Sequence, residues 1–389
     1  MAVRGVYTKA DEEMVAGTNA MFDALAGWDE AKSHLVVTHE SMLTMAFAAD
    51  PFNPLWNDGE YAKGTRWGGL IAHPLFFDRL ATGGIGMMPA APELGYQHLI
   101  FIGEDWKFFR PAREGDVFRL WRRRPQVIDV TPEDGEGPRT FGLVEADKDF
   151  IGQDDQVAAQ MQSYVERRFL PGPPKPSGLP EYAYTMEELR YIGKTMREEK
   201  VRGAEPRYWE DVEVGEATAP AVLGPTGPVD NLKSYVATPD FLMAVTPREW
   251  FLRALKEGID EEFIPDGTAG LFHVRGGFGA WHWTTHAARA AGEPHPFLFA
   301  KLSRLTMCRC LTNWMGDDGF LAAYSWRHIM RTPVGDTLMA RGKVTGKRTE
   351  GDAHLVDLDV WIENIRGVIT EAAHATVQLP SKTDPVGRI

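Results

Sequence analysis

The chain has 389 residues, of which 43% are apolar and 25% charged, so it is neither a mainly disordered nor a fibrous protein. This length is sufficient for two domains of ordinary size. The 42 Lys and Arg residues are outnumbered by 55 Asp and Glu residues, which gives a formal charge of −13. Because nucleic-acid binding requires a basic surface, this balance argues against nucleic acid as the main partner.

The N-terminal region contains the first predicted helices. Residues 41–49 form a good amphipathic pattern, which ends near Asp50 because Pro51 follows. A second apolar helix is expected from about Ala72, with Pro74 in its first turn, where a missing N–H costs least.

The two halves of the chain repeat one pattern of strands and turns. Trp106 precedes the pair Gly115–Asp116, and Trp326 precedes Gly335–Asp336 at the same spacing. Each pair predicts a turn between two strands. Further strands are expected over Thr140–Asp149, Val157–Phe169, Leu355–Ile365 and Val368–Leu379. We interpret this pattern as two copies of one α+β unit with antiparallel strands.

A proline-rich segment at Pro171–Pro180 separates the copies, since proline interrupts both helices and central strands. A charged connecting helix is predicted over Thr185–Val201. In the second copy an apolar helix is predicted over Leu302–Trp314, closed by Gly316. The expected division is an N-terminal repeat at 1–170, a linker with connecting helix at 171–204, and a C-terminal repeat at 205–389.

The cellular compartment is inferred from cysteine usage and the N-terminus. Only Cys308 and Cys310 occur, which suggests a reducing environment. The first residues lack an apolar signal core, and no apolar run is long enough for a transmembrane helix. We therefore expect a cytoplasmic protein without a membrane partner.

Several motifs resemble those of MaoC-like proteins. The segments 53–62 and 68–74 resemble the hydratase motif, and are more closely similar to the dehydratase domain related to the dehydratase region of fungal fatty acid synthase. Residues 202–215 and 312–320 resemble the second repeat of that family. The resemblance implies a double hot-dog fold, in which each repeat wraps an antiparallel sheet around one long helix.

The resemblance also implies a reaction. Such proteins add water to a 2-enoyl thioester of coenzyme A or acyl carrier protein, or remove it from the 3-hydroxyacyl thioester, without a metal or redox cofactor. This chemistry needs a group that activates water and returns a proton to the α-carbon. It also needs a donor for the developing enolate oxygen, for which we expect an amide near the N-terminus of one central helix. A homo-oligomer is compatible with this expectation.

The family pattern has an aspartate, then a histidine five residues later, with an asparagine between them. In the first half Trp56 stands where the histidine would be, and Asp50 lies one position too far upstream of Asn53. In the second half His282 fills the histidine position, but Gly277 replaces the aspartate. Three possibilities follow: a site that uses His282 with another acid, a site shared between the halves, or a lost hydratase activity.

The resemblance thus implies His282 as general acid/base, with Asp50 and Asn53 orienting water or substrate. The candidates for substrate binding are Trp56, His73 and His286. His73 can alternatively be only a residue of a helix start. The pair His282 and His286 is also spaced like two zinc ligands, but it lacks the glutamate of HExxH and an obvious third ligand.

A third hypothesis is a hot-dog protein that binds a thioester or another hydrophobic ligand without hydrating it. Trp56 at a catalytic position favours this hypothesis or a specialised substrate. The glycines near positions 83–86 and 276–279 lack the GxGxxG form of a dinucleotide site. Asp317 and Asp318 are expected to be solvated in a turn, and the run at 122–124 to be a solvated basic face.

Overall fold

The computed structural model describes residues 9–25, 35–80, 96–122, 126–129, 140–170, 178–237, 282–290 and 293–383. Within these residues the strands of the first half are β1 (Leu35–Val36), β2 (Tyr96–Phe108), β3 (Val117–Arg122), β4 (Gln126–Asp129), β5 (Thr140–Gly152) and β6 (Val157–Leu170). Those of the second half are β7 (Ala221–Leu223), β8 (Phe320–His328), β9 (Leu338–Glu350), β10 (Ala353–Glu363) and β11 (Ile369–Gln378).

All of these strands join one antiparallel sheet. The order is β1-β3-β5-β6-β2-β8-β11-β10-β9-β7, with β4 paired to β5. Strands of the two halves meet where β2 pairs with β8, from Gly103 opposite Arg327 to Lys107 opposite Ala323. A Cβ atom at Gly103 would lie 2.1 Å from the carbonyl oxygen of Trp326, so only glycine fits this close approach.

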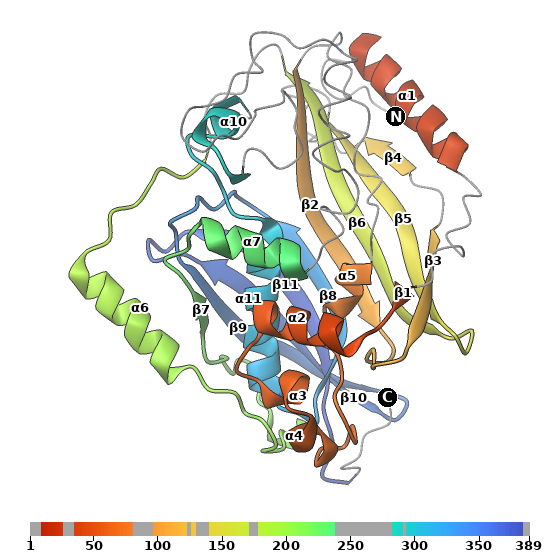
Figure 1. Ribbon diagram of the computed structural model, residues 1–389, viewed down its shortest axis with the longest axis vertical. Helices are drawn as coiled ribbons and strands as arrows, with labels where there is room; N and C mark the ends of the chain where they lie inside the picture. Colours follow the sequence, from red (N-terminus) through yellow and green to blue (C-terminus); the bar gives the residue numbers. More distant parts are fainter. Residues whose placement is uncertain are drawn as a thin grey trace.

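The described helices are α1 (Lys9–Leu25), α2 (His39–Ala49), α3 (Pro54–Asn57), α4 (Gly59–Lys63), α5 (Phe76–Leu80), α6 (Met186–Glu198), the 3₁₀-helix η3 (Trp209–Asp211), α7 (Pro228–Ala237), α10 (Thr285–Ala290) and α11 (Ala300–Met315). Several helices lie near the centre of the view in Figure 1, whereas α1, α6 and α10 lie toward its periphery. From Leu302 to Met315 every residue of α11 is buried. Among the described helices, none is both long and apolar enough to cross a membrane.

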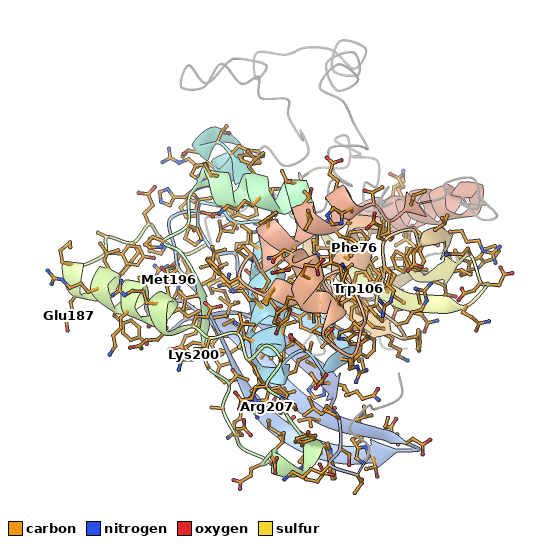
Figure 2. The ribbon with its side chains drawn as sticks, turned by 60° about the horizontal axis from the view of Figure 1, so that its bottom comes forward. Phe76, Trp106, Glu187, Met196, Lys200 and Arg207 are labelled. Carbon is orange, nitrogen blue, oxygen red and sulfur yellow. The ribbon has the colours of Figure 1, made fainter. Side chains whose placement is uncertain are left out.

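Several predicted elements are confirmed. Helix α2 ends at Ala49 with Asp50 as its C-cap, and α11 ends at Gly316, whose φ is 72°. Helix α6 begins after Thr185, which forms a capping box with Glu188. This helix lies beside the edge strand β7, and Figures 1 and 2 show it at the periphery, away from the interior.

The predicted turns and strands are also confirmed. Gly115 and Gly335 both have positive φ, 85° and 103°, and each lies between two strands of the sheet. Strands β5, β6, β10 and β11 agree with the four predicted ranges within a few residues at each end. The helix expected from Ala72 begins later, at Phe76, and the residues after Leu80 lie outside the described part of the chain.

A buried ionic network joins the two halves. Arg304 of α11 forms ion pairs with Asp78 of α5 and Glu104 of β2, and all three side chains are at most 5% exposed. Lys301 also pairs with Asp78, at 3.3 Å. Glu104 in turn accepts a hydrogen bond of 2.8 Å from Trp106 Nε1. Although burial alone would raise the pKa of Asp78, the charges of Arg304 and Lys301 hold it below its ordinary value.

Candidate functional site

A pocket lies where the two halves meet. Its walls are mainly apolar and aromatic, and they come from both halves: Trp56, Trp67, Ile71, Ala72, His73, Pro74, Phe77, Phe108, Arg110, Pro111, Ala112, Met315, Gly319, Phe320 and Leu321. The interior has a volume of about 20 Å³, room for a single water molecule. A larger ligand must therefore move side chains of the wall apart.

Hydrogen bonds beside the pocket join residues of the first half to the turn that follows α11. The hydroxyl of Tyr61 donates to Asp317 Oδ2 at 2.6 Å, and Trp67 Nε1 donates to the carbonyl oxygen of Asp317 at 2.7 Å. Arg66 Nη1 donates to the carbonyl of Asp318 at 3.0 Å. The interpretation of Asp317 as a solvated turn residue is wrong, because it is 3% exposed and ties the turn after α11 to the first half.

Asp50 is fully buried at the end of α2. Its Oδ2 accepts hydrogen bonds from Trp56 Nε1 at 3.1 Å and from the Thr312 hydroxyl at 3.3 Å, and its Oδ1 has no partner among the described residues. Burial raises the pKa of Asp50, and the bond from Trp56 acts against this shift. The observed role of Asp50 is to fix the indole that replaces the expected histidine, while its catalytic role stays a prediction.

Asn53 is also buried, at 2% exposure, and caps α3. Its Oδ1 accepts a hydrogen bond of 3.1 Å from the amide of Leu55. This cap places Trp56 in the wall of the pocket, whereas Asn53 is not itself among the lining residues. A direct contact of Asn53 with water or substrate therefore stays a prediction.

His73 lies in the pocket wall and is 1% exposed. Its Nδ1 accepts a hydrogen bond of 3.2 Å from the amide of Leu75, so the proton of the neutral ring is on Nε2. That Nε2 is buried and has no hydrogen-bond partner among the described residues. The rings of His73 and Trp56 form a T-shaped contact, with 5.8 Å between ring centroids. Burial lowers the pKa of His73 to about 3, so the ring is neutral at physiological pH.

His282 lies just before α10 and is 8% exposed. Its Nδ1 donates a hydrogen bond of 2.7 Å to the carbonyl oxygen of Phe297, which fixes the tautomer with the lone pair on Nε2. The ring stacks on Phe299 at 3.7 Å between centroids and meets Phe297 edge-on. Burial lowers the pKa of His282 to about 3. His282 is not among the residues that line the pocket.

The predicted residues are therefore brought together only in part. Trp56 and His73 share the pocket, and Asp50 reaches it through Trp56. Within the described part of the chain, no hydrogen bond or ion pair joins His282 to Asp50. The side chain of His286, on α10, lies outside the described residues, as does Gly277. No group of three or more metal-binding side chains occurs among the residues that the structure describes.

Two wall residues, Trp67 and Phe320, were not predicted to contribute to the site. Trp67 immediately precedes the motif at 68–74, and Phe320 ends the motif at 312–320. Their rings lie 6.4 Å apart between centroids, although they belong to different halves. The sequence motifs therefore point to the neighbourhood of both residues. The contact between the two rings depends on long-range packing and has no local signal.

The two buried histidines predict acid sensitivity. An unfolded imidazole has a pKa of about 6.5, whereas burial lowers the pKa values of His73 and His282 to about 3. Between these values the unfolded chain binds more protons, so stability falls as the pH falls. Each histidine contributes up to about 1.4 kcal/mol per pH unit to this slope.

We expect His73→Asn and His282→Asn each to reduce the acid sensitivity in urea unfolding measured from about pH 6 to about pH 4. In each variant the stability relative to wild type should rise as the pH falls. The exposed His374, paired with Asp359, supplies the control variant His374→Asn. Parallel pH profiles for wild type and both buried-histidine variants would contradict the prediction.

Comparison with known proteins identifies the architecture. Residues 24–161 match the family model of the FAS1-like dehydratase domain region. A solved MaoC-like dehydratase is 14% identical with a TM-score of 0.58, and the alignment covers 89% of this chain and 95% of that one. A MaoC domain protein dehydratase from Chloroflexus aurantiacus is also 14% identical, with a TM-score of 0.54 and coverage of 90% and 93%.

A third solved structure, a Mycobacterium tuberculosis protein with a double hotdog fold, is 13% identical with a TM-score of 0.48, and covers 89% of this chain and 93% of its own. A search of curated protein sequences gave no match. The first two structures show the fold of this chain.

Proposed function

We propose that the chain is a hydro-lyase for a 2-enoyl thioester, because residues 24–161 match the family model of the FAS1-like dehydratase domain region and the fold is similar to that of a solved MaoC-like dehydratase. The enzyme would add water to give the 3-hydroxyacyl thioester, or catalyse the reverse dehydration. The carrier would be coenzyme A or acyl carrier protein, and no metal or redox cofactor is required by this chemistry. Its compartment would be the cytoplasm.

The observation that carries the proposal is the fixed tautomer of His282. Its Nδ1–H is committed to the Phe297 carbonyl, so the lone pair is on Nε2, the form required of a general base. This position also matches the histidine of the hydratase motif.

In the proposed reaction, His282 Nε2 removes a proton from water while the oxygen of the water forms a bond to C3. Because His282 does not line the described pocket, the opening of the walls that a ligand requires must also bring C3 within reach of His282. The electron pair of the double bond moves toward the thioester to give an enolate, and the imidazolium of His282 then returns the proton to C2, which restores the neutral ring. The reverse sequence expels water. Asp50 and Asn53 would act through the placement of Trp56, whose indole cannot serve as a base.

We also propose that the chain is a duplicated hot-dog, with repeats at 1–170 and 205–389 and a linker with connecting helix at 171–204. The pairing of β2 with β8 would be the seam between the repeats. Helix α11 would be the long central helix of the second repeat, and α5 would begin that of the first. Such an internal pair resembles a dimer, and a further homo-oligomer is compatible with it.

A second candidate function is thioester binding without turnover, favoured by Trp56 in place of a histidine.

The two candidate functions are tested with a panel of 2-enoyl-CoA thioesters of increasing chain length and with aromatic acyl groups. Hydration is followed as the loss of absorbance of the conjugated enoyl thioester, and binding by calorimetry. Turnover supports the hydro-lyase, binding without turnover supports the second candidate, and neither binding nor turnover contradicts both.

A further inference from the structure

We propose that His73 is a neutral hydrogen-bond donor that holds the thioester carbonyl oxygen of the ligand in the pocket between the two halves. This inference rests on the proposed function, because it takes the ligand to be an acyl thioester. It assigns to a histidine side chain the role for which we expected a backbone amide at a helix N-terminus.

The hydrogen bonds around His73 fix which atom can donate. The amide of Leu75 donates to Nδ1 at 3.2 Å, so the ring carries its proton on Nε2. This N–H is buried in a side chain that lines the pocket, and it has no partner among the described residues. A buried donor without an acceptor is costly, and an acceptor on a ligand would satisfy it.

The backbone of the three residues after His73 does not supply the donor in its place. Pro74 has no N–H, and the amide of Leu75 is committed to the His73 ring. The next amide, of Phe76, donates to the carbonyl oxygen of His73 at 2.8 Å. Of these positions, the imidazole of His73 is the one that retains a donor for a ligand.

The surroundings favour a neutral acceptor over an anion. The His73 ring is unprotonated at physiological pH. The charged residue of the wall, Arg110, is paired through Nη1 with Asp116 at 2.7 Å, while its buried Nε has no hydrogen-bond partner among the described residues. The remaining wall is largely apolar, with the rings of Trp56 and His73 in a T-shaped contact. A carbonyl oxygen within an apolar ligand suits a neutral donor in a largely apolar wall. Such a fixed donor stabilises the negative charge that develops on the carbonyl oxygen and does not transfer a proton.

Two substitutions separate the donor from the shape of the site. In His73→Asn the amide oxygen can still accept from Leu75, but the donor corresponding to Nε2 is lost. In His73→Gln the amide nitrogen can take the place of Nε2, so a donor toward the pocket remains. Both side chains are uncharged, and melting temperatures identify any variant that fails to fold.

The decisive measurement compares two ligands that differ in the carbonyl group. Calorimetry gives the Kd of a saturated acyl-CoA thioester and of the matching S-alkyl-CoA thioether for wild type and both variants. We expect wild type to prefer the thioester by about tenfold, the worth of one neutral hydrogen bond. This preference should vanish in His73→Asn and persist within about threefold in His73→Gln.

The possible failures are distinguishable. An equal preference for the thioester in wild type and folded His73→Asn would overturn the role of His73 and leave the hydro-lyase untouched. A wild type that hydrates enoyl thioesters but binds the thioester and the thioether equally would also overturn the role of His73 and leave the hydro-lyase untouched. If wild type binds neither ligand and hydrates no enoyl thioester, the proposed function fails first, and this inference with it.

Discussion

The variant His282→Asn is expected to fold and to lose about 10²- to 10⁴-fold in kcat on the best enoyl thioester. The amide nitrogen of asparagine can still donate to the carbonyl oxygen of Phe297, which in wild type receives the Nδ1–H at 2.7 Å. The side chain then lacks the atom corresponding to Nε2, the proposed base. The loss should therefore appear in kcat, since the local packing between Phe297 and Phe299 changes little.

Steady-state kinetics and urea unfolding on the same preparation test this prediction. The variant His374→Asn serves as the control, because His374 is half-exposed and pairs with Asp359 away from the site. A kcat for His282→Asn within about threefold of wild type would show that His282 is a packing residue and not the base.

The sequence predicted the scaffold better than the site. Helix α11 could be located because an apolar run ends at Gly316, and the turns at Gly115 and Gly335 follow from glycine in a positive-φ position. The apolar run and the glycine positions are local properties of the chain. The resemblance likewise located His282 and Trp56 by their place in a motif.

The site required information that is not local. Trp67 and Phe320 meet across the seam of the two halves, and Asp317 is buried because Tyr61 and Trp67 donate to it. His73 was a sequence candidate for substrate binding, but the donor role proposed for it depends on which ring nitrogen accepts from the Leu75 amide. Hydrogen-bond direction at a histidine follows from three-dimensional neighbours and has no signature in residue type or spacing.

The same limitation applies to the seam. Nothing in the periodicity of Leu302–Trp314 indicates that Arg304 would be 1% exposed, since an arginine in a helix is usually solvated. Burial is possible there because Asp78 and Glu104 both pair with its guanidinium. These three residues come from α11, α5 and β2, so their charges are balanced only in the folded chain.

Substitution Arg304→Met is therefore expected to lower the free energy of unfolding by about 3 to 5 kcal/mol. Methionine fills most of the space but leaves Glu104 buried without its cation, and leaves Asp78 with Lys301 alone. The matched control is Arg327→Met, which removes a half-exposed pair with Asp105 at the same β2–β8 seam. That pair should contribute only about 0 to 1 kcal/mol.

Urea unfolding of both variants measures these costs, and a triple variant identifies their origin. In Asp78→Asn/Glu104→Gln/Arg304→Met both buried carboxylates are replaced by neutral amides. The amide oxygen introduced at position 104 can still accept the hydrogen bond that Trp106 Nε1 donates to Glu104 in wild type. Most of the lost stability should return, because the cost of Arg304→Met lies in the uncompensated carboxylates. If the triple variant is as unstable as Arg304→Met, the arginine stabilises the seam through its packing over Trp326 and not through its charge.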